Sequence, residues 1–201
     1  MKIVYATASP VPSLAANSIH VMKMAQALAR NGHDVVLIAR NKMKDEVEAG
    51  PGGVFGFYGV APLFAFRSFR CLPGKAGVIL HAFRVALAAS LAGADILYTR
   101  CLPTACAAAL TGLRVIYERH DDFGSAGKGS RKAFSWLAAR RNLLGVVVIS
   151  EALAQHISEE HGVPRAKIIV AHDGAVARND HRRLESEELF ESGAELERVR
   201  R

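Results

Sequence analysis

Residues 2–39 decide the fold class, and they read KIVYATASPVPSLAANSIHVMKMAQALARNGHDVVLIA. The apolar run Lys2–Ala6 predicts a strand, and the apolar spacing of Ser18–Asn31 predicts a helix. The β-branched run Val35–Ile38 is typical of a parallel strand that is buried on both faces. This stretch therefore predicts a strand–helix–strand unit.

Apolar runs and helical patterns keep alternating along the rest of the chain. Helical patterns cover residues 75–91, 103–110, 130–141 and 151–161, and strand-like runs cover 95–99, 114–117, 146–149 and 167–170. Residues 40–74 are irregular, although 54–60 could form another strand. About six strands that alternate with helices predict an α/β fold, a Rossmann-like, doubly wound parallel sheet. We expect a single domain over residues 1–176 and a charged tail over 177–201.

Composition indicates a globular chain. Of the 201 residues, 50% are hydrophobic and 22% are charged, and the mean hydropathy is +0.14. Two enzyme-sized domains do not fit this length. His81 and Arg84 interrupt the longest apolar stretch, 76–93, so we expect no membrane-spanning helix. Because the N-terminus does not resemble a signal peptide, we expect the chain in the cytoplasm.

Positive charge exceeds negative charge, with 26 Lys and Arg against 19 Asp and Glu and a net charge of +7. The excess suggests an anionic partner: a nucleotide, a phosphorylated substrate, an acidic membrane surface or nucleic acid. Residues 63–84 interleave aromatic with basic side chains, namely Phe64, Phe66, Phe69 and Phe83 with Arg67, Arg70, Lys75 and Arg84. Such a segment can dock on an anionic membrane, although we favour a core helix with a solvated face. No nucleic acid partner is expected, because no recognition motif accompanies the charge.

The loop after the first strand, residues 7–17, contains no glycine. A dinucleotide-binding fold needs a Gly-x-Gly-x-x-Gly turn at this place, so a nicotinamide or flavin enzyme is disfavoured. We expect Asn17 or Ser18 to cap the following helix. The free N–H groups of that helix's first turn could hold a phosphate or a sugar oxygen, or no ligand at all.

Polar residues follow three other predicted strands. Arg100 could clamp a phosphate or carboxylate, or form a surface ion pair. His120 could move a proton or bind a sugar hydroxyl, with Glu118 or Asp121 orienting it, although a solvated loop has the same composition. Ser150 and Glu151 have the pattern of an N-cap with an acidic first turn.

No metal site is expected. His120, Asp121 and Asp122 are adjacent on a strand end and therefore diverge, and the sequence offers no second ligand cluster. The three cysteines, Cys71, Cys101 and Cys106, contain no Cys-x-x-Cys pair, so neither a disulfide framework nor a zinc site is suggested.

Five stretches of the chain match a known family in sequence and in order. They read SPVPSLAANSIHVMKMAQALARNGHDV (9–35), DILYTR (95–100), VIYERHD (115–121), VVVISEAL (146–153) and GVPRAKIIVAHDG (162–174). Together they resemble the N-terminal domain of family 4 glycosyltransferases of the GT-B fold.

The resemblance implies retaining, metal-independent transfer of a sugar from a nucleotide-sugar donor to a sugar or lipid-linked acceptor, without a cofactor. His120 would be the catalytic residue beside the transferred sugar. Asn17 and Ser18 would face the diphosphate or the acceptor. The remaining substrate-binding residues would be Arg100, Glu118 and Asp121 on the acceptor side and Ser150 and Glu151 near the cleft.

The family's C-terminal domain, which binds most of the donor nucleotide, does not follow within the 201 residues. The tail 177–201 would then begin an interdomain linker, and the chain would be inactive alone. It would be a truncated form, a gene remnant, or one chain of a split enzyme that a complementary C-terminal chain completes. If the acceptor is lipid-linked, we expect the chain to lie peripherally at the inner face of a membrane. Two alternatives stay open: a non-catalytic module that binds a sugar phosphate or lipid phosphate, and another GT-B enzyme such as a nucleotide-sugar epimerase.

Overall fold

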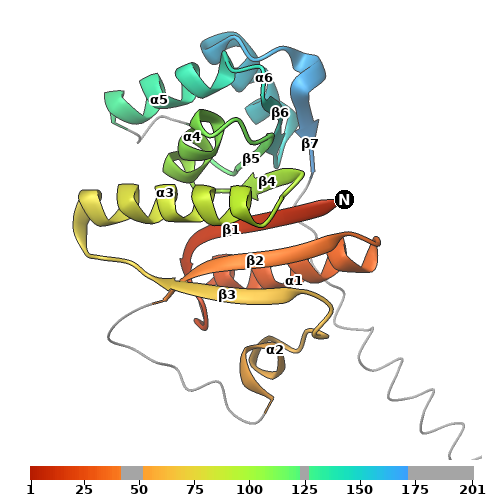
Figure 1. Cartoon of the computed structure of the whole chain (residues 1–201). Helices are drawn as coiled ribbons and strands as arrows, with labels where there is room; N and C mark the ends of the chain where they lie inside the picture. Colours follow the sequence, from red (N-terminus) through yellow and green to blue (C-terminus); the bar gives the residue numbers. More distant parts are fainter. Residues whose placement is uncertain (42–51, 123–126, 172–201) are drawn as a thin grey trace, which may run out of the picture. The chain divides into compact units, whose positions relative to one another are not determined.

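The structure, a computed structural model, describes residues 1–41, 52–122 and 127–171. Its strands form one seven-stranded sheet in the order β3-β2-β1-β4-β5-β6-β7, and every neighbouring pair is parallel (Figure 1). The strands are β1 (Lys2–Pro10), β2 (Asp34–Asn41), β3 (Ala65–Arg70), β4 (Ile96–Thr99), β5 (Val115–Arg119), β6 (Leu143–Val148) and β7 (Ile168–Val170). The helices are α1 (Ala16–Arg30), α2 (Gly53–Tyr58), α3 (Gly74–Leu91), α4 (Leu102–Leu110), α5 (Lys128–Ala138) and α6 (Glu151–His161), with a 3-10 turn at Arg165–Lys167. The α/β, Rossmann-like fold is confirmed.

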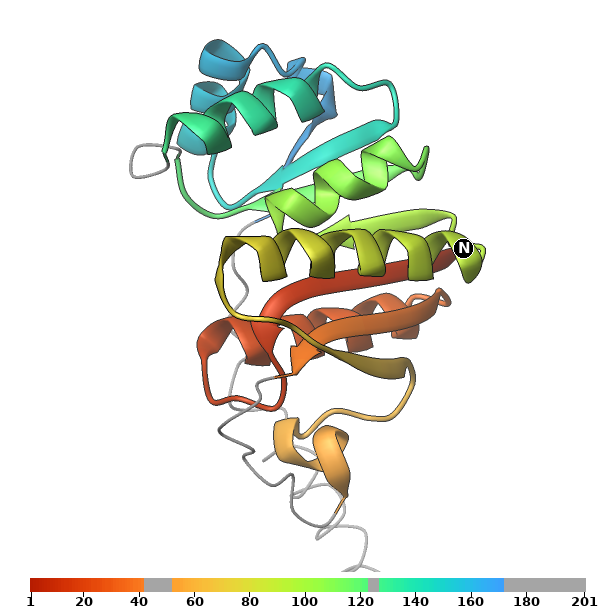
Figure 2. The same ribbon diagram turned by 60° about the vertical axis from the view of Figure 1, so that its left-hand side comes forward.

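Alternate residues of each central strand enter two different cores. On β1, Val4 packs in the larger core with α3 and α4, whereas Tyr5 packs in the smaller core with α1. Figures 1 and 2 show α3 and α1 on opposite sides of the sheet. This period of two explains why the central strands read as continuous apolar runs.

Two features of the irregular stretch differ from expectation. Residues 53–58 form the helix α2, so the strand considered at 54–60 is wrong; the left-handed backbone of Gly59 ends this short helix. The strand β3 at the sheet edge was not predicted, because its charged and half-exposed residues lack the apolar run of a central strand. Residues 63–84 therefore combine β3 with the start of α3 rather than a single core helix. The expected tail, 177–201, lies outside the described residues.

Helix α3 is long and apolar enough, by length and composition alone, to cross a membrane. Core helices of globular domains meet the same criterion. One side of α3, which includes Ala82, Val85 and Ala89, is fully buried in the larger core, and the helix contacts α4 and β1. Its place in the fold is thus that of a helix layered on the sheet.

Gly77 sets the path of the chain into α3. A Cβ atom at this position would lie 1.9 Å from the carbonyl oxygen of Leu72. We expect Gly77→Ala to lower the free energy of unfolding by roughly 1–3 kcal/mol, because backbone atoms on both sides must shift. Gly129→Ala in α5 is the matched control, since nothing lies within 4 Å of its added Cβ. Urea unfolding of both variants tests the contact, and equal stabilities would contradict it.

Candidate functional site

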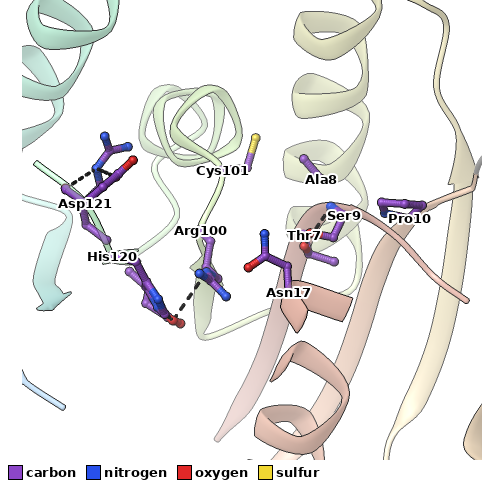
Figure 3. Close-up of a pocket in the computed structure, with 11 residues that line it drawn as sticks. Thr7, Ala8, Ser9, Pro10, Asn17, Arg100, Cys101, His120 and Asp121 are labelled. Carbon is purple, nitrogen blue, oxygen red and sulfur yellow. Dashed lines mark hydrogen bonds and ion pairs between the residues drawn. The ribbon is translucent and has the colours of Figure 1, made fainter. Parts of the chain in front are cut away.

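A pocket of about 680 Å³ opens where the strand order reverses, between β1 and β4. In open parallel sheets, ligands bind beyond the carboxyl ends of the strands at this point. The walls come from the end of β1, the first turn of α1 and the chain after β4 and β5 (Figure 3). The lining residues are Thr7, Ala8, Ser9, Pro10, Asn17, Arg100, Cys101, Glu118, Arg119, His120 and Asp121.

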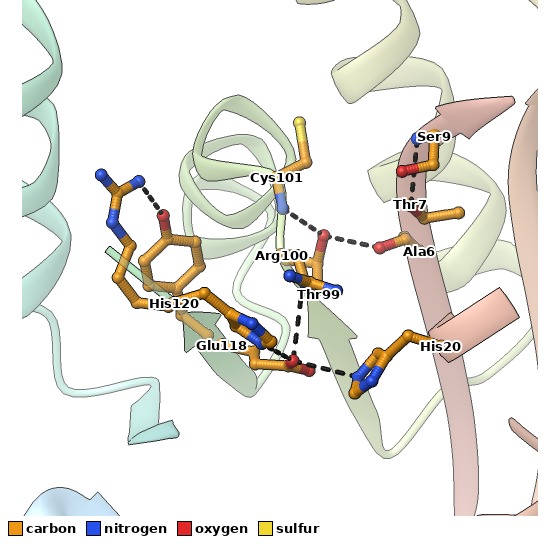
Figure 4. Close-up of polar contacts among 11 residues, drawn as sticks. Ala6, Thr7, Ser9, His20, Thr99, Arg100, Cys101, Glu118 and His120 are labelled. Carbon is orange, nitrogen blue, oxygen red and sulfur yellow. Dashed lines mark hydrogen bonds and ion pairs between the residues drawn. The ribbon is translucent and has the colours of Figure 1, made fainter. Parts of the chain in front are cut away.

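Glu118 of β5 is the centre of a polar cluster beside this pocket, and it is only 4% exposed. Its Oε1 accepts a hydrogen bond from Nε2 of His120. Nε2 of His20, from α1, lies 3.2 Å from the same oxygen, and Nε of Arg100 lies 3.6 Å from it (Figure 4). One buried carboxylate therefore contacts two imidazoles and a guanidinium from α1 and from the loops after β4 and β5.

These contacts keep Glu118 ionised. Burial by itself would raise its pKa, but the polar groups of His20, His120 and Tyr98 that face the carboxylate lower it. The positive charge of Arg100 lowers it further, and the resulting pKa is about 2. Burial and the Glu118 charge raise the pKa of Tyr98, so this hydroxyl stays protonated and able to donate.

Thr99 joins the strand ends behind Arg100. Its buried hydroxyl donates to the carbonyl oxygen of Ala6 on β1 at 2.8 Å and accepts the N–H of Cys101 at 3.0 Å. The two bonds tie β4 to β1 and fix the turn that carries Arg100. A buried hydroxyl with both partners resists displacement, because leaving either partner unpaired costs about 1–3 kcal/mol.

Asp121 pairs with Arg119 rather than with His120. Nε of Arg119 lies 2.7 Å from Oδ1 of Asp121 and donates to the Asp121 carbonyl at 2.9 Å. The sequence left open whether Glu118 or Asp121 orients His120, and in the structure Glu118 makes that contact.

The structure brings together five of the residues singled out from the sequence: Asn17, Arg100, Glu118, His120 and Asp121 line one pocket. Ser18 does not line it. Its side chain is fully buried, and its hydroxyl donates to the carbonyl oxygen of Pro10 at 2.7 Å. The expectation that Asn17 or Ser18 caps α1 is wrong, because the helix begins earlier with Ala15 as N-cap and no side-chain cap bond.

Ser150 and Glu151 also lie outside the pocket lining. The Ser150 hydroxyl accepts the N–H of Leu153 at 3.2 Å as the N-cap of α6. Nη2 of Arg165 donates to both carboxylate oxygens of Glu151, at 3.0 and 2.7 Å. Their place near the cleft between two domains stays a prediction.

Sequence reasoning missed His20 and Tyr98. His20 reads as one more polar position of an amphipathic helix, and its role depends on how α1 packs across the ends of the strands. Tyr98 reads as an ordinary strand residue, and its ring meets Tyr5 edge to face in the smaller core. A detectable signal was that His20 belongs to the first turns of a helix that starts at the sheet's carboxyl edge.

Three ligand atoms from His20, Glu118 and His120 lie within 4.8 Å of one another, which is a spacing that could hold a metal ion. The sequence places His120 beside Asp121 and Asp122 and predicts no other cluster of ligands, whereas this group combines His120 with His20 and Glu118. However, both imidazoles already contact Oε1 of Glu118, and the Arg100 guanidinium lies 3.6 Å from that oxygen. A neighbouring cation disfavours a bound metal cation at this place.

The family model of Glycosyltransferase Family 4 matches residues 18–176. The chain belongs to glycosyltransferase family 4. The matched region contains every residue of the Glu118 cluster. No curated protein matches the chain significantly.

Solved structures share the fold at low identity. Anabaena HepE, solved with UDP and glucose, is 14% identical and has a TM-score of 0.61. The match covers 93% of this chain and 50% of HepE. Sucrose-phosphate synthase from Thermosynechococcus elongatus is 11% identical and has a TM-score of 0.60. The match covers 87% of this chain and 48% of the synthase. The UDP-GlcNAc 2-epimerase from Methanocaldococcus jannaschii is 15% identical and has a TM-score of 0.59. The match covers 85% of this chain and 45% of the epimerase. The family 4 chain described here thus spans about half the length of these proteins.

Proposed function

We propose that this family 4 domain is the acceptor-side half of a retaining, nucleotide-sugar-dependent glycosyltransferase that works in the cytoplasm or at the inner face of a membrane. The observation that carries the proposal is the Glu118 cluster, which holds His120 at the topological switch point of a family 4 domain. HepE, solved with UDP and glucose, supports a nucleotide-sugar donor.

His120 is the residue that we place beside the transferred sugar. The ionised Glu118 carboxylate can only accept, so the imidazole N–H at Nε2 donates to it. This contact fixes the tautomer and the direction of the ring. The ring is 22% exposed at the pocket, where it can bind a sugar hydroxyl or stabilise charge that develops during transfer.

Arg100 and Asn17 are the groups that we assign to substrate oxygens. Arg100 is 17% exposed and keeps N–H donors for a phosphate or carboxylate, because its contact with Glu118 at 3.6 Å runs through Nε. Asn17 lines the same pocket from the first turn of α1, where the helix dipole favours anionic groups. We propose that neither residue needs a metal ion, since the positive charge at this site is supplied by side chains.

One domain alone offers one wall of a cleft. Transfer requires both substrates to be held in line and water to be excluded, which a single wall does not achieve. We therefore propose that residues 1–201 are inactive by themselves and that a C-terminal domain of the family binds most of the nucleotide.

Isothermal titration of the full chain with a panel of nucleotide sugars tests the proposal, with and without an added family 4 C-terminal domain and with transfer assayed in the same samples. We expect binding and transfer only with the added domain, with the anomeric configuration retained and with no loss in EDTA. Tight nucleotide binding by the chain alone would overturn the assignment of the donor site. Binding without transfer in the combined sample would favour a non-catalytic module, and an epimerised nucleotide sugar would favour an epimerase.

A further inference from the structure

An apolar stripe runs along the outer side of α3. Its members recur at three- and four-residue spacing, and each is about half exposed or more: Ile79 (53%), Leu80 (50%), Phe83 (47%), Leu87 (56%) and Leu91 (80%). The opposite side of the helix holds the residues packed on the sheet. Leu72, just before the helix, is 59% exposed and extends the stripe.

Such a contiguous exposed apolar surface indicates a binding face. A helix that is apolar on both sides normally has a neighbour on both sides or lies against lipid. Among the described residues, α3 is covered on its inner side by the sheet and flanked by α4, while the α3 apolar stripe has no cover. We therefore expect a binding partner outside the described residues to cover this face.

Basic residues accompany the stripe without acidic ones. The sequence from Gly52 to Ala94 contains no aspartate or glutamate, while it contributes exposed Arg67, Arg70, Lys75 and Arg84. Within the described ranges no carboxylate lies within ion-pair distance of these four. Their positive charge is therefore uncompensated by described residues and complements an anionic surface.

A second pocket, of about 380 Å³, lies at the start of the stripe. Its lining combines cations with apolar groups: Arg70, Cys71, Leu72, Gly77, Leu80, His81 and Arg84. His81 is 4% exposed, and its Nδ1 has no hydrogen-bond partner among the described residues. Burial, with the charges of Arg40 and Arg84, lowers the pKa of His81.

The guanidinium of Arg84 is already oriented at this pocket. It lies 5.2 Å from the centre of the Phe69 ring and donates to the carbonyl oxygen of Arg70 at 3.2 Å. A pocket with two arginines and a buried imidazole whose Nδ1 has no partner in the described part of the chain, bordered by leucines, matches a phosphate attached to an apolar chain.

We propose that the α3 apolar stripe docks this domain on a membrane that contains anionic phospholipid, and that Arg70, Arg84 and His81 bind the phosphate of one lipid headgroup. A second copy of the chain fits this face poorly. A two-fold contact would place the four uncompensated cations of one copy against those of the other. An anionic lipid surface accepts both the apolar and the cationic groups.

Docking through this face would bring the site toward the membrane. β3 pairs with β2 up to Arg70, and β2 pairs with β1 up to Pro10, so α3 starts at the same sheet edge as the 680 Å³ pocket. A lipid-linked acceptor could reach that edge from the bilayer. This last step rests on the proposed transferase function, whereas membrane docking itself does not.

Flotation of the full chain with vesicles tests the docking without donor, acceptor or C-terminal domain. We expect binding to vesicles of phosphatidylcholine mixed with phosphatidylglycerol and much weaker binding to phosphatidylcholine alone. The double variant Ile79→Gln, Leu87→Gln should lower the partition coefficient about ten-fold or more, since two side chains lose their apolar burial. The control Ile169→Gln, Leu110→Gln changes one Ile and one Leu of similar exposure outside the stripe and should bind as wild type.

The headgroup pocket is tested with Arg70→Gln, Arg84→Gln. Its partition into the anionic vesicles should fall about ten- to thirty-fold, while the weak binding to phosphatidylcholine stays unchanged. Equal binding by the stripe and control variants would overturn the proposal. So would a dimer, seen by analytical ultracentrifugation, that the stripe variant dissociates, because the stripe would then belong to a second copy. Circular dichroism confirms that each variant is folded, and transfer to a water-soluble acceptor reports on the proposed function separately.

Discussion

Replacing His120 by alanine is expected to lower kcat about 100- to 1,000-fold when the chain is combined with a C-terminal domain, with little change in KM for the acceptor. The range is that of a single positioned group which acts on the transition state. His120 lines the pocket, and its Nε2 is anchored by Glu118, so the ring is held in one direction before substrate binds. Steady-state kinetics with saturating donor provides the measurement.

The matched control for this variant is His156→Ala. His156 is a half-buried histidine on α6 and does not line the pocket. We expect it to keep wild-type kcat. If His120→Ala retained full activity while the control behaved the same way, His120 would be a structural partner of Glu118 and the transferred sugar would lie elsewhere.

Much of the fold and half of the site could be predicted because the decisive signals are local. The central strands β1, β4 and β5 are short apolar runs, and each is followed directly by polar residues. Parallel strands bring their carboxyl ends to one edge, so the sequence pattern alone places Arg100 and His120 near each other. The pocket lining confirms that both lie at this edge.

The parts that could not be predicted depend on packing between distant segments. The pairing of His20 with Glu118 joins α1 to β5, nearly one hundred positions apart, and no local pattern encodes it. The burial of Glu118 could not be predicted from the sequence either, because a carboxylate that follows an apolar strand is usually exposed to solvent. Ser18 shows the opposite error: a residue type typical of helix caps is buried and bonds to Pro10 instead.

The Glu118→Gln variant is expected to lose about 3 kcal/mol of unfolding free energy at neutral pH. The native pKa of Glu118 is about 2 against an ordinary value of 4.5, and each unit corresponds to about 1.4 kcal/mol. Because the pKa is lowered in the folded state, this stabilisation is fully present above about pH 4.5. It is lost as the pH falls toward about 2, where the folded state also takes up the proton.

Urea unfolding of wild type and Glu118→Gln across this acidic range isolates the contribution of the one carboxylate. The difference between them should shrink as the pH falls, while Asp34→Asn, which removes a 68% exposed carboxylate 3.9 Å from Lys2, should differ from wild type by less than about 0.5 kcal/mol at every pH. A constant difference for Glu118→Gln would mean that its charge does not stabilise the fold. In that case His120 would lack its ionised anchor, and the loss of transfer in His120→Ala could no longer be attributed to a ring oriented by Glu118.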